Sequence, residues 1–335
     1  MLARLEHALV ARWYGRPGLL WMLVPLELVF RAIVALRARV RSRVLPPVPV
    51  IIIGNITVGG SGKTPLVIWL ANALQARGLR VGVVSRGHGG GGPFPLRVDG
   101  RTAVVDCGDE PALVARSTGA AVVVDPDRRR ALASLLQLGV DVVLSDDGLQ
   151  HLALPRTVEI AVVDARRGLG NGHCLPTGPL REPAGRLASV GLVVVNGAGP
   201  FRYPGAVPMT LVPTLFRKVD GTAEPLSISA FRDRFGDRVA AVAGIGDPPR
   251  FFASLRALGF FVDEYPFPDH HVFAAGDLPA GNGGAGVVVM TAKDAVKCAG
   301  LAGVDAWYLE IDAQLPPTFL ARLLVMANLE EEGAA

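Results

Sequence analysis

V-I-I-I-G-N-I-T-V-G-G-S-G-K-T-P, residues 50 to 65, is the stretch of sequence from which the fold follows. The continuous apolar run at 50–53 predicts a buried strand, and the apolar spacing after Lys63-Thr64 predicts a helix. The glycines between them leave room for backbone N–H groups to converge on phosphate oxygens, at the positive N-terminal end of the following helix. The stretch therefore predicts a strand, a phosphate-binding loop and a helix in succession.

The loop contains the residue types that nucleotide binding needs. The predicted nucleotide-binding residues are Thr57, Val58, Gly59, Gly60, Ser61, Gly62, Lys63 and Thr64. Lys63 would supply positive charge to the outer phosphates, and Thr64 a hydroxyl for Mg²⁺. The loop departs from the standard pattern at one position, because Thr57 stands where a glycine is expected. A glycine-rich turn that merely precedes a lysine is the alternative, and the order of strand, Gly-Lys-Thr and helix disfavours it.

The 335 residues are enough for two ordinary domains with a sizeable core. Half of them are hydrophobic, which is high for a purely soluble enzyme, although only 6% are aromatic. The net charge is +4, and no acidic residue occurs between Glu27 and Asp99, so the basic excess is N-terminal. Cys107, Cys174 and Cys298 are far apart and form no Cys-x-x-Cys pair, which argues against disulfides or a zinc site and favours a reducing, cytoplasmic setting.

Residues 1–47 form an apolar and basic segment before the first predicted strand. The stretch 18–36 is nearly long enough to span a bilayer, but Pro25, Glu27 and Arg31 interrupt it. The arginines at its end are Arg31, Arg37, Arg39, Arg41 and Arg43. We interpret the segment as an amphipathic element in the membrane interface, with its arginines toward anionic headgroups. A helical hairpin packed on the protein's own core and a true spanning helix are the alternatives.

Short β-branched runs alternate with stretches of helical spacing after residue 48. The predicted strands are 81–85, 121–124, 142–145, 160–164 and 192–195, and the predicted helices between them include 109–117 and 126–138. This alternation predicts an α/β fold with a doubly wound, mostly parallel sheet, whose ligands bind at the carboxyl ends of the strands. We expect a P-loop domain over 48–196, a smaller Rossmann-like α/β lobe over 197–314, and a C-terminal helix at about 315–329 that packs back on the first domain.

Two acidic pairs follow apolar runs. Asp146-Asp147 comes directly after the strand at 142–145, which suits a Mg²⁺ site beside a nucleotide because hard oxygen ligands offset phosphate charge. Asp109-Glu110 stands at the start of a predicted helix, where acidic residues are common caps, so this pair taken alone is more often structural. Glu110 is a third candidate metal ligand, and the sequence does not rank the three.

Two loops contain further polar residues. The loop at 170–183 is rich in glycine and proline, which predicts a shaped loop whose polar groups could hold a hydroxylated substrate. The loop at 265–271 contains Asp269-His270 after a predicted strand. A histidine in that position could orient or tune a general base.

Taken together, the motifs resemble the tetraacyldisaccharide 4′-kinase family, which phosphorylates a membrane-embedded acylated glucosamine disaccharide in the lipid A pathway. The matching pieces are G-N-I-T-V-G-G-S-G-K-T-P (54–65), S-R-G (85–87), G-D-E-P (108–111), S-D-D-G-L-Q-H (145–151), G-N-G (170–172), L-P-T-G-P-L-R-E-P (175–183), A-G-I-G-D-P (243–248), F-P-D-H (267–270) and T-A-K-D-A-V-K (291–297). The first piece and those of the 170–183 loop are together highly specific. His88 stands where the family usually has tyrosine, and Thr177 where it usually has alanine.

The resemblance implies a kinase that transfers the γ-phosphate of ATP, with Mg²⁺, to the 4′-hydroxyl of a tetraacyldisaccharide 1-phosphate. It implies Asp109 as the general base, His270 as the residue that orients or tunes it, and Lys63 as the phosphate-binding cation. Mg²⁺ would be held by Thr64 and Asp147, with Asp146 or Glu110 nearby. The expected substrate contacts are Gln150, His151, Asn171 and Arg181.

The expected partners are the acylated disaccharide and an anionic membrane surface, without nucleic acid. The expected location is the cytoplasmic face of the bacterial inner membrane, as a peripheral or monotopic protein. The main alternative is a membrane-associated nucleotide-switch ATPase of the MinD and ParA type, whose signature lysine corresponds to Val58 here. The substrate-like loop at 170–183 also counts against it. A soluble small-molecule kinase with a core-packed N-terminal segment is a second alternative.

Overall fold

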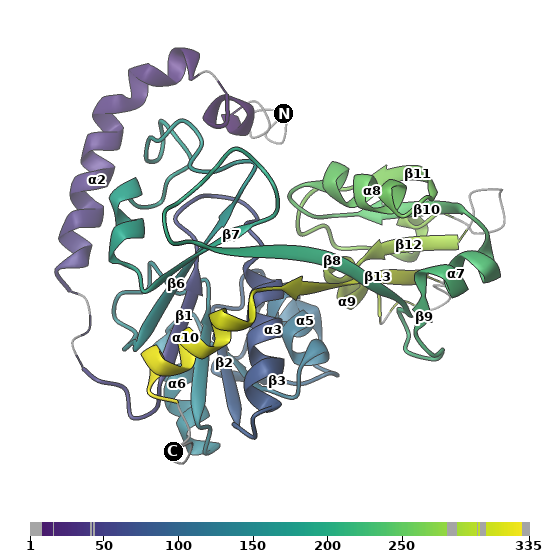
Figure 1. Ribbon diagram of the computed structural model, residues 1–335, viewed down its shortest axis with the longest axis horizontal. Helices are drawn as coiled ribbons and strands as arrows, with labels where there is room; N and C mark the ends of the chain where they lie inside the picture. Colours follow the sequence, from purple (N-terminus) through teal and green to yellow (C-terminus); the bar gives the residue numbers. More distant parts are fainter. Residues whose placement is uncertain are drawn as a thin grey trace. The chain divides into compact units, whose positions relative to one another are not determined.

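In the computed structural model, residues 9–15, 17–40, 42, 44–279, 287–299, 301 and 306–329 are described. The chain forms two compact units, which are described separately below (Figure 1). Unit 1 comprises Met1–Arg86, Gly119–Thr210 and Gln314–Ala335, and unit 2 comprises Gly87–Thr118 and Leu211–Ala313. The segment Gly87–Thr118 thus belongs to unit 2, although in chain order it lies within the range 48–196 expected for the first domain.

Unit 1 is built on a parallel sheet with the strand order β7-β6-β1-β5-β2-β4. The strands are β1 (Val50–Gly54), β2 (Val81–Ser85), β4 (Ala121–Val124), β5 (Val142–Asp146), β6 (Val158–Asp164) and β7 (Leu192–Asn196). Every residue of β1, β2, β5 and β6 is buried, as expected for Val- and Ile-rich strands of a sheet covered on both faces. The predicted α/β fold with a mostly parallel sheet is confirmed.

Helices cover this sheet and its register aligns the strand ends. The helical elements of unit 1 after β1 are α3 (Lys63–Gln75), α6 (Arg128–Gln137), the 3₁₀ turn η2 (Ala184–Ser189) and α10 (Pro317–Ala327). α3 contacts β1, β2 and β5, α6 contacts β2 and β4, and α10 contacts β6. Ile53 of β1 pairs with Asp146 of β5, so the loop after β1 begins beside the acidic pair that ends β5.

The N-terminal segment of unit 1 contains the 3₁₀ helix η1 (Gly18–Leu23) and α2 (Val24–Ala38), which runs along the outside of the unit (Figure 1). Pro25 does not interrupt this helix, because it lies in the first turn, where a backbone N–H has no helical partner. Gly18–Ala38 is long and apolar enough to cross a membrane by length and composition, alone among the helices of the described residues. Arg41 and Arg43 lie outside the described residues.

Unit 2 contains the parallel strands β11-β10-β12-β13 in that order, with β8 beside β13 and β9 antiparallel to β8. Its strands are β3 (Leu96–Val98), β8 (Val207–Lys218, which starts in unit 1), β9 (Leu226–Ser227), β10 (Arg238–Ala243), β11 (Phe261–Pro266), β12 (Val287–Thr291) and β13 (Ala306–Gln314). Its helices are α4 (Val104–Cys107), α5 (Asp109–Ser117), α7 (Ile228–Phe235), α8 (Pro248–Ala257), the 3₁₀ turn η3 (Ala275–Asp277) and α9 (Ala292–Cys298). Stacked and edge-on rings of Phe216, Phe231, Phe260 and Trp307 fill its core.

The proline-rich stretch 197–236 contains the twelve-residue strand β8, with Pro208 and Pro213 inside it. A proline is tolerated in a strand where its missing N–H is not needed by the neighbouring strand. All three cysteines are free and buried, in keeping with the predicted absence of disulfides.

Candidate active site

The loop between β1 and α3 is fixed by side chains that bond its carbonyl groups. Three donors each bond one loop carbonyl: Tyr14 bonds Val58 at 3.0 Å, Asn55 bonds Gly59 at 3.2 Å, and Asn196 bonds Ser61 at 3.0 Å. Within the part of the chain that the structure describes, the N–H groups of residues 60–64 donate to no protein oxygen. Engaged carbonyls and available N–H groups are what a phosphate-binding loop requires.

Gly62 forms the junction between this loop and α3. Its φ of 92° lies in the left-handed region, which glycine adopts without steric cost. A Cβ atom here would also collide with the amide nitrogen of Asn196. α3 begins at the next residue, Lys63, and no side chain caps it. A lysine at the positive end of a helix is electrostatically unfavourable by itself, and a bound anion would offset that charge.

Thr57, the residue that breaks the standard loop pattern, has a structural explanation. It forms an antiparallel bridge with Leu180, and the N–H of Val58 donates to the Pro179 carbonyl at 2.8 Å. The start of the phosphate-binding loop is therefore paired with the loop at 170–183. Extended pairing of this kind accommodates a β-branched residue.

Asp147 lies at the end of β5 among cations. Its φ of 49° is in the left-handed region, which is uncommon for a residue other than glycine. Its carboxylate is 3.4 Å from Lys63 Nζ and accepts a hydrogen bond from Arg181 Nη1 at 2.9 Å. Burial by itself raises the pKa of Asp147, but Lys63 and Arg181 outweigh burial and hold the pKa below its usual value. The structure thus brings Lys63, Asp147 and Arg181 together, and Thr64 lies in the first turn of α3.

Asp146 and Gln150 lie deeper in the same region. Asp146 is only 2% exposed, so its side chain faces the interior at the end of β5. Gln150 donates to Glu182 Oε1 at 2.7 Å, and its own side-chain oxygen lies 3.4 Å from Arg181 Nη1. Gln150 therefore links Arg181 to Glu182.

His151 and Asn171 are also placed in unit 1. Burial, followed by the nearby charge of Arg128, lowers the pKa of His151 to about 4, so its ring is neutral at pH 7. Asn171 donates to the Thr177 carbonyl at 3.0 Å and accepts from the His173 N–H at 3.1 Å. The side chain of Asn171 thus stabilises the loop that contains it.

Asp109 is the centre of a second cluster, entirely within unit 2. It is the first residue of α5, after Gly108, and its side chain is 5% exposed. Its Oδ2 atom is 3.0 Å from His270 Nδ1, 3.6 Å from Lys293 Nζ and 3.8 Å from Lys297 Nζ. Burial by itself raises the pKa of Asp109, but His270, Lys293 and Lys297 outweigh it and hold the pKa at about 2. The carboxylate is therefore ionised at pH 7.

His270 is the partner that the sequence predicted for Asp109, although the two are 161 residues apart. Its φ of 60° lies in the left-handed region. The hydrogen bond to Asp109 raises the pKa of His270 above its usual value, against the effect of burial. The ring of His88 lies edge-on to it, with 5.4 Å between ring centroids.

Glu110, the third candidate metal ligand, lies in unit 2, with its carboxylate 3.5 Å from Lys293 Nζ. The other two candidates, Asp146 and Asp147, lie in unit 1. Among the described residues, no three His, Cys, Asp or Glu side chains gather into a cluster that could hold a metal ion.

Sequence reasoning missed three basic residues of these clusters. Arg128 is buried and donates to the carbonyl groups of Asp146 and Asp147 at 3.1 and 3.0 Å. Lys293 and Lys297 lie one helical turn apart on α9, on the side that contacts α5. The i, i+4 spacing of the two lysines in T-A-K-D-A-V-K could have indicated that they share one side of a helix. Arg128 is a single arginine at a helix start, and nothing in the sequence around it indicates a role in the site.

Comparison with known proteins identifies the family. The family model for tetraacyldisaccharide-1-P 4′-kinase (LpxK) matches residues 19–328. The chain belongs to this family. It is 51% identical over 281 residues to a tetraacyldisaccharide 4′-kinase of Alkalilimnicola ehrlichii, covering 83% of this chain and 82% of that one. It is 47% identical over 341 residues to the corresponding kinase of Azotobacter vinelandii, covering 96% and 98%.

A solved structure agrees with this assignment. LpxK from Aquifex aeolicus, crystallised in complex with ATP, superposes with a TM-score of 0.76 at 27% identity and covers 93% of this chain and 100% of its own. The resemblance read from the motifs is therefore confirmed. This member of the family is an ATP-binding kinase of lipid A biosynthesis, and its acceptor is a lipid disaccharide phosphate. The match supports the kinase over the nucleotide-switch alternative.

Proposed function

We propose that Asp109 is the general base of the 4′-kinase reaction. In this reaction the acceptor oxygen forms a bond to the γ-phosphorus, the bond from that phosphorus to the bridging oxygen breaks, ADP leaves, and the hydroxyl proton goes to Asp109. The observation that carries the proposal is the buried, ionised carboxylate bonded to His270 and flanked by Lys293 and Lys297. A carboxylate with a pKa of about 2 is a weak base, which suffices when the proton leaves late, after bonding to phosphorus has begun.

His270 acts on Asp109 rather than on the substrate in this proposal. Its Nδ1 atom, 3.0 Å from Asp109 Oδ2, and the Glu110 N–H, which donates to Oδ1 at 2.9 Å, together fix the rotamer of the carboxylate. Oδ1 keeps a second lone pair with which to accept the proton. The left-handed backbone at His270 is a strained conformation of the kind that persists where it serves a function. We assign His270 the role of a positioning residue.

Lys63 and the loop amides would bind the outer phosphates of ATP. Thr64 and Asp147 fit Mg²⁺, because Mg²⁺ in kinases needs only one or two carboxylates besides substrate phosphates and water. Asp147 is the better candidate for direct contact, since its side chain is 31% exposed while Asp146 is buried. Mg²⁺, when bound, would neutralise charge on the phosphates. Glu110 remains a proposed metal ligand. The proposed substrate contacts remain Gln150, His151, Asn171 and Arg181.

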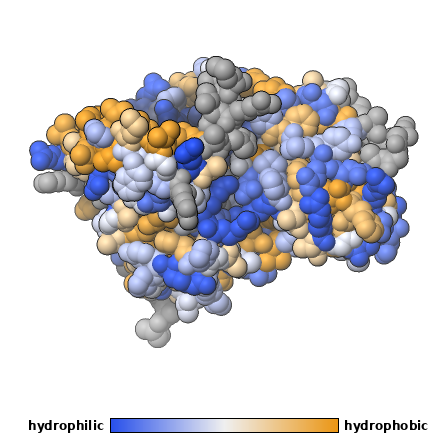
Figure 2. Space-filling view, turned by 90° about the horizontal axis from the view of Figure 1, so that it is seen from above, coloured by the Kyte–Doolittle hydropathy of each residue, from blue (hydrophilic) through white to orange (hydrophobic). Residues whose placement is uncertain are grey.

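The N-terminal segment supports a proposed membrane surface as partner. Exposed apolar side chains run along η1 and α2, and Figure 2 shows hydrophobic residues gathered over this part of the surface. Such a surface next to arginines suits an interface with anionic headgroups, which supports the proposed location at the cytoplasmic face of the inner membrane. Flotation of the protein with anionic vesicles tests the proposed membrane contact. Ile33→Glu, on the exposed side of α2, should weaken flotation. Unchanged flotation of this variant would refute the membrane contact.

Asp109→Ala tests the base. We expect turnover to fall by about three orders of magnitude, because general base catalysis contributes about 10²–10⁴. ATP affinity, measured by calorimetry, should stay at the wild-type value because the phosphate-binding loop is intact. Asp106→Ala, an acidic residue three positions earlier, is the matched control and should keep wild-type turnover. Wild-type turnover in Asp109→Ala would remove this residue from the role.

A further inference from the structure

α2 is apolar on its outside and acidic on its inside, the reverse of an ordinary surface helix. Glu27, 3% exposed, is the one buried residue of this fully described helix. The apolar residues Leu26, Val29, Ile33 and Leu36 are instead 51–62% exposed. A buried carboxylate is costly unless it is bonded, so the interior side of α2 must offer partners to Glu27.

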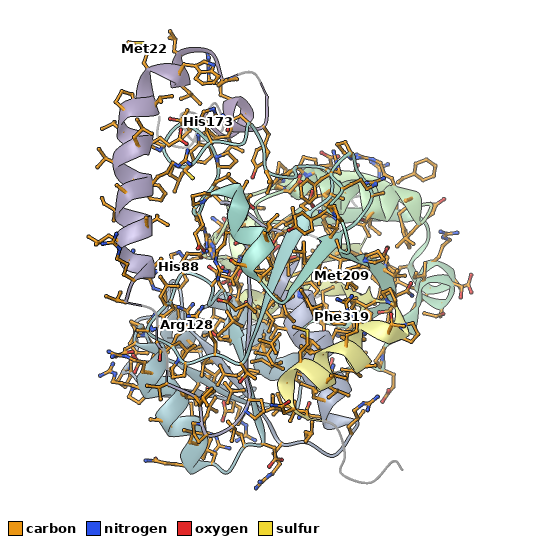
Figure 3. The ribbon with its side chains drawn as sticks, turned by 60° about the vertical axis from the view of Figure 1, so that its left-hand side comes forward. Met22, His88, Arg128, His173, Met209 and Phe319 are labelled. Atoms are coloured by element: carbon orange, nitrogen blue, oxygen red, sulfur yellow. The ribbon has the colours of Figure 1, made fainter. Side chains whose placement is uncertain are left out.

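Apart from Arg31, one turn further along α2 and 3.8 Å from Glu27 Oε1, those partners belong to the loop at 170–183. Glu27 accepts the backbone N–H of Cys174 at 2.9 Å, and its other oxygen is 2.7 Å from His173 Nδ1. Trp21 of η1 packs edge-on against the His173 ring, with 4.8 Å between centroids. Figure 3 shows His173 beside the inner side of α2, while Met22 points away from it. Burial by itself raises the pKa of Glu27, but the bonds from Cys174 and His173 outweigh it and lower the pKa.

The same loop is bonded to the phosphate-binding loop. The Leu180 N–H donates to the His173 carbonyl at 3.1 Å, which ties the two sides of the loop together. Next to it, the Pro179 carbonyl accepts from the Val58 N–H at 2.8 Å, and the Arg181 N–H donates to the Ile56 carbonyl at 2.7 Å. The Arg181 side chain continues to Asp147. Hydrogen bonds, joined by the peptide bonds of residues 179–181, thus connect the apolar helix to the phosphate-binding loop and Asp147 within unit 1.

A second contact supports the same path. Trp13 donates from its indole nitrogen to the Pro176 carbonyl at 3.0 Å, and Tyr14 donates to the Val58 carbonyl. The segment before η1 therefore contacts both the 170–183 loop and the phosphate-binding loop directly.

We propose that Glu27 is a positioning residue for phosphoryl transfer. Through its bonds to Cys174 and His173 it holds the 170–183 loop against the phosphate-binding loop. Binding of the apolar helix to lipid is thereby linked to the geometry of the ATP site. The link to lipid rests on the proposed membrane role, whereas the hold on the loop does not. The contacts also mean that α2 lies on the bilayer, because a spanning helix would draw the polar loop that binds Glu27 into the hydrocarbon.

Glu27→Leu is the decisive variant, because it makes the helix more apolar while removing the acceptor of the loop. We expect kcat to fall about tenfold, since a lost hydrogen bond to a charged group and a loosened loop misplace the groups that bind phosphate. Vesicle flotation should be equal to or stronger than wild type. Amide hydrogen exchange should speed up in 171–181 and in 56–62, which a role confined to local packing would not produce.

Two variants separate this effect from unfolding. Glu27→Gln keeps an oxygen for the Cys174 N–H and a polar group for His173, so kcat should stay within about twofold of wild type. His173→Phe keeps the ring packing on Trp21 but removes the bond to Glu27, and should lose part of kcat and of exchange protection. If Glu27→Leu does not fold, His173→Phe decides alone: wild-type kcat and exchange in that variant would overturn the proposal.

Ile33→Glu is the matched control on the opposite side of the same helix. It should reduce vesicle flotation while exchange in 171–181 and 56–62 stays at the wild-type rate. Unchanged flotation of Ile33→Glu would refute the membrane role alone. Wild-type kcat and exchange in folded Glu27→Leu would refute the positioning role alone.

Discussion

α3 of unit 1 and α5 of unit 2 both begin after a glycine of positive φ but carry opposite charges at their first position. Gly62 precedes α3 with φ 92° and ψ 24°, Gly108 precedes α5 with φ 88° and ψ 160°, and neither helix has a side-chain cap. The first residue of α3 is Lys63, and that of α5 is Asp109. A helix N-terminus carries a partial positive charge, so α5 stabilises its own aspartate while α3 and Lys63 together favour an external anion. Two helix starts that both follow a glycine of positive φ thus suit a phosphate site in one unit and a fixed carboxylate in the other.

The two clusters also differ in how their aspartates are surrounded. Asp147 lies among Lys63 and Arg181 with about a third of its side chain exposed, so ligands can reach it. Asp109 is buried, and His270, Lys293 and Lys297 hold its charge in place. The arrangement around Asp147 suits the exchange of metal and nucleotide. The arrangement around Asp109 suits a general base whose carboxylate is ionised before each reaction over a wide pH range.

After Asp109→Ala, replacing the charge at the start of α3 should have the largest effect. Lys63→Met removes the cation that the helix end and loop present to phosphate, so turnover should fall by about 10²–10³. ATP affinity should fall as well, in contrast to Asp109→Ala, and calorimetry with steady-state kinetics measures both. Arg77→Met, an exposed basic residue just past the end of α3, is the control and should match wild type. Wild-type ATP affinity in Lys63→Met would show that the start of α3 is not the phosphate site that the comparison with α5 assigns to it.

The partner of Asp109 should control the pH dependence of the reaction. With the pKa of Asp109 at about 2, its base form is complete above pH 4, so the acid limb of kcat/KM in wild type lies below that pH. His270→Gln removes the hydrogen bond that most opposes burial, so the pKa of Asp109 rises and the acid limb moves to higher pH. Rate at neutral pH should fall about tenfold from lost positioning. His271→Gln, whose ring contacts Asp277 instead, should leave the profile unchanged.

An acid limb that stays in place in His270→Gln would show that His270 does not set the protonation of Asp109. Because the pKa of His270 is raised, its protonated form is lost only as pH rises through that raised value. The basic side of the wild-type profile should therefore extend beyond pH 6.5, the usual pKa of histidine.

The glycines before the two helices should show the smallest effect, on stability. Gly62→Ala and Gly108→Ala each force a side chain into the left-handed region, and each Cβ would meet a neighbour, Asn196 or the His88 carbonyl. Each should lower the free energy of unfolding by about 1–3 kcal/mol in urea titrations. Gly60→Ala is the control, since nothing lies within 4 Å of its Cβ position. Equal stability of all three variants would mean that the shared helix start is unimportant.

The strands and the nucleotide loop could be predicted because their signals are local. The apolar run from Val50 to Ile53 predicts a buried strand without reference to the rest of the chain. Lys63-Thr64 directly follows the glycines, so the loop is also recognised from neighbouring residues. Asp109 and His270 were paired only through the family resemblance, because residues 161 positions apart share no local signal. Lys293 and Lys297 were visible as a motif, but their approach to Asp109 depends on how α9 packs on α5.

Sequence by itself determined the parallel α/β fold, the phosphate-binding loop and the family, because hydrophobic period and glycine spacing act over a few neighbouring residues. Only tertiary structure decided what Glu27 does. In the sequence it is a charge that interrupts an apolar stretch, and in the structure it is the buried acceptor of a loop 146 residues away. The physical reason is that a carboxylate in an apolar helix is tolerated only where distant backbone and side-chain donors meet it, and the fold alone brings those donors to it.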